Sequence, residues 1–282
     1  MNETGGDGRM IRDEVIHPSM LKHLGSVSGK KVFDAGCGDG IIGRELTKQG
    51  AQVIGGDFVF DFASVAHTGS PTLSTIVSDV ARLPIADESF YKLVSNLVLM
   101  WAPDIENSVK EFARILKHGA RAAISITHPM VNLGEFDSSD KNHPKLILSE
   151  SLQEGTYLKM INQTNGPYLY YQRPPATYVN TFTKNCFKLV EGSGYEDVFF
   201  SDDFLKKHPQ YIRHKMFPLF LILSFDKVWV CIHYAHHSYD RTIDEFKKHD
   251  ASDEWISTHV NKVESKSNDP IDFHRSLIQK KI

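Results

Sequence analysis

The stretch Lys31-Val32-Phe33-Asp34-Ala35-Gly36-Cys37-Gly38-Asp39-Gly40 decides the fold. Its apolar start over residues 31–35 predicts a short buried strand, and helical spacing from Ile41 to Lys48 predicts a helix directly after the glycines. Glycine at every second position lets the backbone turn sharply and lets a ligand lie against the main chain without a Cβ in the way. The order strand, glycine turn, helix therefore predicts a ligand-binding loop.

The spacing of these glycines separates the loop from two other nucleotide-binding loops. A dinucleotide fingerprint requires G-x-G-x-x-G, whereas here the third glycine comes early, at Gly40, and position 41 is isoleucine. A Walker loop ends in Gly-Lys-Ser or Gly-Lys-Thr, and this loop does not. The spacing therefore disfavours both an NAD-dependent dehydrogenase and a Walker-type phosphate site.

Acidic residues close the next two predicted strands. Asp57 lies about twenty residues beyond the loop, where a nucleoside site places its ribose-binding acid, and its two oxygens can accept from two vicinal hydroxyls. Asp79 can accept a hydrogen bond from an adenine amine while the backbone N–H of Val80 or Ala81 reaches a ring nitrogen. Together, three successive strand ends predict one crevice at the carboxyl edge of the sheet.

Strands and helices alternate along the first half of the chain. We predict strands over 31–35, 51–55, 75–78, 92–99 and 120–127, and helices over 13–24, 41–48, 62–67 and 104–117. Because the strands are nearly continuous apolar runs, the pattern indicates a parallel sheet covered on both faces. A helix over 178–193 and strands over 197–200 and 219–232 complete it, and their short connection allows an antiparallel last strand.

Composition changes mark three other segments. Residues 1–10 are polar and glycine-rich and are predicted to be disordered, and residues 235–282 form a charged C-terminal extension. Residues 130–177 are polar with scattered aromatics and are predicted to be an insertion that caps the sheet.

Several motifs resemble the class I S-adenosylmethionine-dependent methyltransferases, and among these the small-molecule enzymes related to the ubiquinone-biosynthesis type. The matching stretches are Asp34 to Gly40, Gly56-Asp57, Asp79 to Pro84, Asp87 to Phe90 and Glu111 to Gly119. The resemblance spans roughly residues 11–234. It implies an α/β, Rossmann-like sheet of seven mostly parallel strands with helices on both faces and an antiparallel last strand. It also implies S-adenosylmethionine as the cofactor.

The resemblance assigns a part of the cofactor to each strand end. The methionine end falls to Asp34, Gly36, Cys37, Gly38 and Gly40. Asp57 and Phe58 fall to the ribose, Asp79 and Val80 to the adenine, and Asn96 and Leu97 to the methyl donor. Cys37 is interpreted as a small space-filling residue and not as a nucleophile. Ser95-Asn96-Leu97 lacks the Asn-Pro-Pro-Tyr/Phe signature of enzymes that methylate planar amines, which disfavours that subgroup.

Candidates for the acceptor side come from the end of strand five, the insertion and the N-terminal helix. His128 ends the fifth strand, and its imidazole titrates near neutral pH, so it is the candidate for a catalytic base or a substrate-binding group. His17, Tyr170, Tyr171 and Tyr178 are candidate substrate residues, since an aromatic-rich cap suits a partly apolar ligand. The cluster His233, His236, His237 lacks a partner at ligand spacing, so we predict no metal.

Bulk composition limits the class of partner. Lys plus Arg total 32 against 35 Asp plus Glu, which disfavours a nucleic-acid partner, and the longest apolar run is too short to span a membrane. The cysteines Cys37, Cys186 and Cys231 are odd in number and widely spaced, which fits reduced thiols in a cytoplasmic protein. We expect a monomer or a homodimer. Two alternatives to a small-molecule methyltransferase stay open: a transfer-RNA methyltransferase, and a catalytically inactive cofactor-binding protein of the same fold.

Overall fold

A computed structural model describes residues 10–70, 72–129, 134–137, 145–148, 154–160 and 167–229. All of these belong to one compact unit, Met1–Cys231. The predicted disordered N-terminus, apart from residue 10, and the extension over 235–282 lie outside the described residues. The same holds for the cluster His233, His236, His237.

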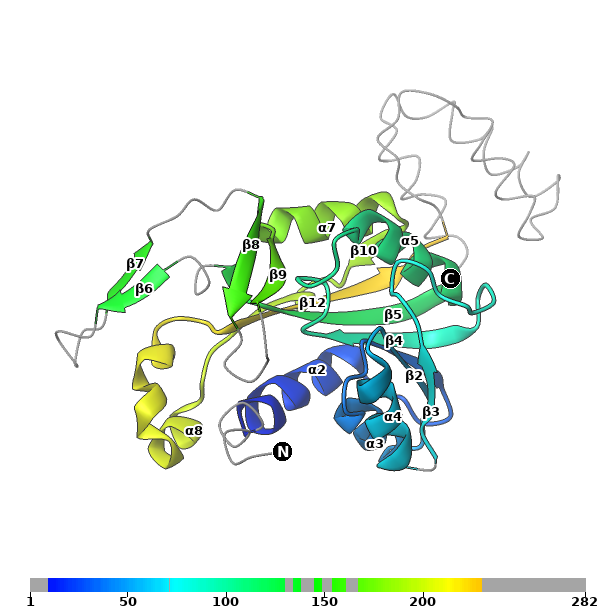
Figure 1. The fold of residues 1–282 in the computed structure, drawn as a ribbon, viewed down its shortest axis with the longest axis horizontal. Coiled ribbons are helices and arrows are strands. Elements are labelled where there is room, and N and C mark those ends of the chain that lie inside the picture. Colours follow the sequence, from blue (N-terminus) through cyan, green and yellow to red (C-terminus); the bar gives the residue numbers. More distant parts are fainter. Residues whose placement is uncertain are drawn as a thin grey trace, which may run out of the picture. The chain divides into compact units, whose positions relative to one another are not determined.

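A twisted sheet with the order β3-β2-β1-β4-β5-β12-β10 organises the unit, and β11 also pairs with β12 (Figure 1). Strands β1 to β5 are mutually parallel, and β12 runs antiparallel to β5, which confirms the predicted fold class. The strands are β1 Lys31–Ala35, β2 Gln52–Asp57, β3 Ser74–Val77, β4 Phe90–Asn96, β5 Leu116–Thr127, β10 Phe187–Leu189, β11 Tyr195–Val198 and β12 Phe220–Lys227.

The edge beyond β12 differs from the predicted single strand. Strands β10 and β11 pair with successive parts of β12, and residues 190–194 interrupt them. Val190 N–H still donates to Ser224 O, and Ser224 N–H donates to Gly194 O, so this is one edge strand divided by a short excursion. The predicted helix over 178–193 is therefore wrong beyond α7 (Pro175–Lys184), because Cys186 adopts a positive φ of 66° that ends it.

Helices cover both faces of the sheet, as predicted (Figure 1). One face packs against α5 (Ile105–Ile115) and α7 through apolar residues such as Phe112 and Phe182. The other face packs against α2 (His17–Leu24), α3 (Ile41–Lys48) and α4 (Phe60–Thr68). A π-helical turn, η2 (Arg12–Ile16), leads into α2, and α8 (Asp202–Lys207) and η3 (Pro209–Lys215) fill the connection before β12.

Local sequence explains where α5 begins. Asp104 is its N-cap and accepts from Asn107 N–H at 2.9 Å, which satisfies one of the donors that the first turn leaves unpaired.

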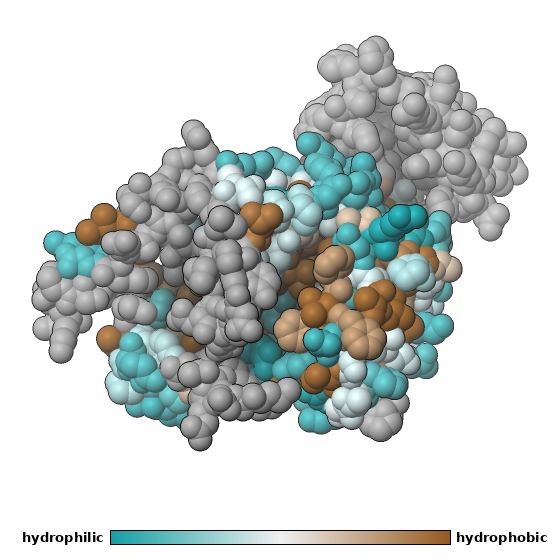
Figure 2. All heavy atoms as spheres, viewed as in Figure 1, coloured by the Kyte–Doolittle hydropathy of each residue, from teal (hydrophilic) through white to brown (hydrophobic). Residues whose placement is uncertain are grey.

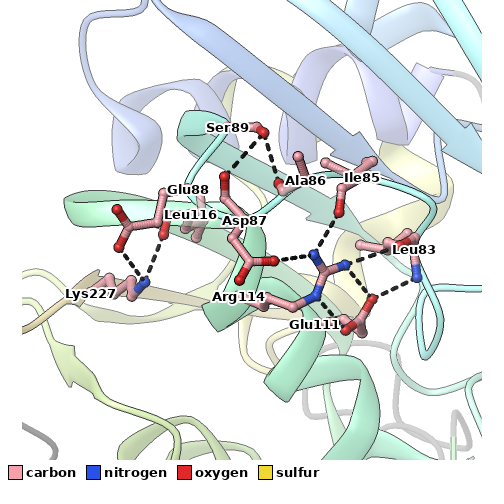
Figure 3. Close-up of polar contacts among 10 residues, drawn as sticks. All are labelled: Leu83, Ile85, Ala86, Asp87, Glu88, Ser89, Glu111, Arg114, Leu116 and Lys227. Carbon is pink, nitrogen blue, oxygen red and sulfur yellow. Dashed lines mark hydrogen bonds and ion pairs between the residues drawn. The ribbon is translucent and has the colours of Figure 1, made fainter. Parts of the chain in front are cut away.

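Near the other end of α5, Arg114 donates to Glu111, to Asp87 and to the carbonyls of Leu83 and Ile85 (Figure 3). This one guanidinium fastens the loop before β4 to the helix.

The segment between β5 and α7 contains two hairpins in its described parts. One pairs β6 (Gly134–Asp137) with β7 (Lys145–Leu148), and the other pairs β8 (Gly155–Met160) with β9 (Pro167–Gln172). The predicted insertion thus has strands of its own, and its role as a cap stays a prediction.

One prediction about the cysteines is wrong. Cys186 is disulfide-bonded, whereas reduced thiols were expected throughout. Cys37 is free and buried, as expected.

Candidate functional site

The glycine loop joins β1 to α3 at the carboxyl edge of the sheet. The N–H groups of Gly36 and Cys37 both donate to Gly56 O, at 2.7 and 3.0 Å, which ties the loop to the end of β2. Gly36, Gly38 and Gly40 have φ of 76°, 53° and 77°. In this left-handed region a residue with a side chain would be strained, so glycine is favoured. A Cβ on Gly40 would lie 2.8 Å from Ala66 Cβ, whereas one on Gly38 would meet nothing within 4 Å. Gly38 therefore borders open space.

Asp57 lies directly beside this loop. Its Oδ2 accepts from Gly38 N–H at 2.8 Å and its Oδ1 accepts from Val59 N–H at 2.9 Å. A carboxylate has about four lone-pair positions, so each oxygen can accept a further hydrogen bond. Asp57 therefore orders the loop and keeps capacity for a pair of ligand hydroxyls.

Asp34 is the most deeply buried acid of the site, with 1% of its surface exposed. Burial, together with the nearby negative charge of Asp57, raises its pKa to about 7. Its Oδ2 has no hydrogen-bond partner among the described residues. Such a carboxyl group is suited to receive a cationic ligand group, which would restore its charged form.

The end of β3 meets the end of β2. Ser78 N–H donates to Asp57 O at 2.9 Å, and the next residue, Asp79, is exposed and accepts from Ala81 N–H. Beside them, Phe58 is 75% exposed, and further large apolar side chains are exposed on α4 and β3, namely Phe60, Phe62, Val65 and Val77. Figure 2 shows apolar side chains, in brown, at the surface on this side of the molecule. The structure thus brings the predicted ribose and adenine residues together.

Strand β4 is shorter than predicted, ending at Asn96 and not at Leu99. The reason is Leu97, whose φ of 58° is unusual for a residue with a side chain. Ser125 on β5 fixes both residues, since its hydroxyl donates to Asn96 Oδ1 at 2.6 Å and its carbonyl accepts from Leu97 N–H at 3.1 Å. Sequence reasoning missed Ser125, because only the register between β4 and β5 brings it to this position.

His128 ends up buried at the carboxyl end of β5, with 6% of its surface exposed. Its Nε2 lies 3.2 Å from Asp197 Oδ1 on β11. Burial lowers the pKa of His128, and the carboxylate of Asp197 opposes this shift only in part. Asp197 was also missed by sequence reasoning, since β12 separates its strand from β5 and the sequence alone does not give their registers.

Three of the four predicted substrate residues, the tyrosines, lie around Arg173. Tyr170 is buried and packs edge-on against Trp101 with ring centroids 5.3 Å apart, and Tyr171 N–H donates to Met100 O. Tyr178 is 1% exposed within the apolar core, and burial raises its pKa to about 12. His17 lies elsewhere, on α2, where burial and Arg12 lower its pKa to about 4, against the opposing effects of Asp13, Asp39 and Glu45.

His17 is thus electrostatically linked to the glycine loop, which contains Asp39. Cys37 packs inside that loop, where a Cβ on Gly55 would lie 2.9 Å from its Sγ, and burial raises the pKa of its thiol. Both observations support the space-filling interpretation of Cys37.

Two negative findings concern the described part of the chain. It contains no group of three His, Cys, Asp or Glu side chains placed to hold a metal ion. None of its helices is both long and apolar enough to cross a membrane.

Comparisons with known proteins place this architecture. Residues 33–124 match the family model described as a methyltransferase domain. Malonyl-[acyl-carrier protein] O-methyltransferase from Pseudescherichia vulneris is 29% identical over 106 residues, covering 38% of this chain and 42% of the relative. Demethylmenaquinone methyltransferase from Corynebacterium kroppenstedtii is 31% identical over 112 residues, covering 40% and 48%. The chain thus spans less than half of the length of either relative.

The fold comparison covers more of the chain. A crystal structure of an S-adenosylmethionine-dependent methyltransferase from Mesorhizobium loti aligns with a TM-score of 0.67 at 20% identity. The alignment covers 74% of this chain and 96% of that one. The overall fold is therefore shared over a larger part of the chain than residues 33–124.

Proposed function

We propose that this chain, whose residues 33–124 form a methyltransferase domain of the class I S-adenosylmethionine-dependent type, transfers the methyl group of that cofactor to a small molecule. The single observation that carries the proposal is the glycine loop with open space at Gly38, bordered by the buried Asp34 and by Asp57. Asp34 supplies a carboxyl group for a cation, and Asp57 supplies hydrogen-bond acceptors for hydroxyls. The glycine loop between them lets a ligand approach the main chain without a Cβ in the way.

The residues present fit the cofactor part by part. Asp34, with its unpartnered Oδ2, would hold the ammonium group of the methionine end. Asp57 would accept from the two ribose hydroxyls while it keeps its bonds to the loop. Asp79 and the backbone of Val80 would border the adenine, with the exposed Phe58 ring packing beside it.

When bound, the cofactor supplies a methyl group on a sulfonium, which is already activated for in-line displacement. This chain therefore mainly has to align the acceptor and exclude water. Leu97 and Val98 form the wall next to the glycine loop, because a Cβ on Gly36 would lie only 2.2 Å from Val98 Cγ2. His128, neutral near pH 7 and paired with Asp197, would accept a proton from a hydroxyl or amine acceptor.

The small-molecule character of the acceptor is supported by three observations. The chain has a formal net charge of −3, the acceptor side contains the Trp101 and Tyr170 rings, and one relative named above is a demethylmenaquinone methyltransferase. Methylation at oxygen or nitrogen, a monomer or homodimer, and a cytoplasmic location stay predictions.

Titration calorimetry tests the proposal on the full chain. We expect saturable binding of S-adenosylmethionine and of S-adenosylhomocysteine, with no binding of NAD, followed by transfer of labelled methyl to an extract of small metabolites. Binding without any transfer would favour the inactive cofactor-binding protein. Transfer to purified transfer RNA, weakening steeply as salt is raised, would favour the nucleic-acid alternative.

A further inference from the structure

Arg173 is a buried cation that no part of the proposed chemistry uses. It follows β9, is 7% exposed, and donates to the carbonyls of Leu99, Ala102 and Pro103 at 2.8, 2.8 and 3.0 Å. Among the described residues, no carboxylate lies within ion-pair distance of it. Only a guanidinium presents several donors in a fixed fork, so a lysine could not make the same three bonds.

The segment that Arg173 holds, residues 97–103, also touches the glycine loop. It begins with Leu97 in its positive-φ conformation, and a side chain persists in this conformation only where its surroundings enforce it. The next residue, Val98, closes over Gly36 so tightly that a Cβ there would overlap it. The cofactor loop and the Arg173 guanidinium therefore hold neighbouring parts of one short segment.

The same segment contacts the insertion. Tyr171 N–H donates to Met100 O at 2.9 Å, and the Trp101 ring packs edge-on against Tyr170 at 86°. The Arg173 guanidinium carbon lies 5.2 Å from the centre of the Tyr171 ring. A continuous set of contacts thus runs from the glycine loop through residues 97–103 to the hairpin β8–β9.

We infer that Arg173 is a positioning residue, which holds residues 97–103 so that occupation of the cofactor loop is coupled to the geometry of the acceptor side. The inference rests on the proposed function, since it requires S-adenosylhomocysteine to bind at the glycine loop. Its consequence is that loosening Arg173 changes both cofactor affinity and the surroundings of Trp101, although Arg173 contacts neither the glycine loop nor the proposed cofactor residues.

Trp101 provides a reporter that needs no known acceptor. The chain has three tryptophans, and a Trp229→Phe/Trp255→Phe background leaves Trp101 alone. In that background, S-adenosylhomocysteine should change Trp101 emission. Arg173→Gln should lose most of this response and weaken the ligand about 2- to 30-fold, the range for residues that couple two sites. Arg173→Lys should restore only part, because it lacks the fork.

The control is Arg121→Gln, which removes the two hydrogen bonds that Arg121 on β5 donates to Asp226 on β12. It should lower the melting temperature and leave the Trp101 response unchanged. If Arg173→Gln does not fold, Val98→Ala tests the same path from the other side and should also weaken the response. Normal affinity and a normal response in whichever variant folds would overturn the inference. A parent chain that binds no S-adenosylhomocysteine would refute the proposed function itself.

Discussion

Replacing Gly38 by alanine distinguishes a cofactor cradle from an ordinary tight turn. The added Cβ would meet no protein atom within 4 Å, so the fold has room for it. The φ of 53° costs alanine about 1–2 kcal/mol, and the lower entropy of the unfolded chain offsets up to about 1 kcal/mol. The net cost of about 0–2 kcal/mol corresponds to a fall in melting temperature of at most about 8 °C for a domain of this size.

Cofactor affinity should respond far more strongly than stability. If the cofactor lies against the main chain in the space beside Gly38, the alanine side chain fills part of the volume that the cofactor needs. Overpacking of this kind costs about 1–3 kcal/mol, which weakens binding about 5- to 150-fold. Calorimetry with S-adenosylhomocysteine measures the affinity, and a thermal melt of the same sample measures the stability.

Gly29→Ala is the matched control. Gly29 has a φ of 69°, and a Cβ there would also meet nothing within 4 Å, but it lies in the turn before β1, at the opposite edge of the sheet. It should show the same small loss of stability with unchanged affinity. Equal affinities for the two variants would refute the assignment of the cradle to Gly38.

Three further predictions concern charged groups. Because the pKa of Asp34 rises from 3.8 to about 7 on folding, the unliganded protein should lose stability as pH rises between these values. In a series of thermal melts at different pH, the Asp34→Asn variant should lose less stability over this range than the parent chain. The same variant should bind S-adenosylhomocysteine more weakly. His128→Ala should keep cofactor affinity but lose methyl transfer, and transfer by the parent chain should stay constant above pH 6.5 and decline only at lower pH; unchanged transfer would remove His128 from the mechanism. Arg114→Gln should lower stability by about 1–3 kcal/mol in urea melts, since it frees the loop carbonyls of Leu83 and Ile85, and an unchanged midpoint would contradict the role assigned to it.

The parts of the fold predictable from sequence are those that depend on local pattern. Apolar runs followed by glycines or acids located β1, β2 and β3, and Asp104 located the start of α5, because a strand end or helix cap needs only a few neighbouring residues. The division of the edge strand by residues 190–194 depends on hydrogen bonds with Ser224, about thirty residues away, which no local pattern contains.

The same distinction applies to the site. The sequence was enough to predict that Asp34, Asp57 and Asp79 lie at one edge, because the carboxyl ends of parallel strands meet there. Ser125, the partner of Asn96, is 29 residues away in sequence, and Asp197, the partner of His128, is 69 residues away. Only the registers of their strands bring these pairs together. The tyrosine pattern of residues 170–178 likewise did not show that Tyr170 and Tyr178 are both buried in the apolar core.

The central claim is that the crevice beside the glycine loop binds S-adenosylmethionine. The most direct measurement is a calorimetric titration of the full chain with S-adenosylhomocysteine, repeated with Asp57→Ala. We predict one saturable site per chain, with binding strongly weakened in the variant, because Asp57 orders Gly38 and would accept hydrogen bonds from the ribose. No measurable heat of binding in a folded parent chain, or equal binding by parent and variant, would contradict it.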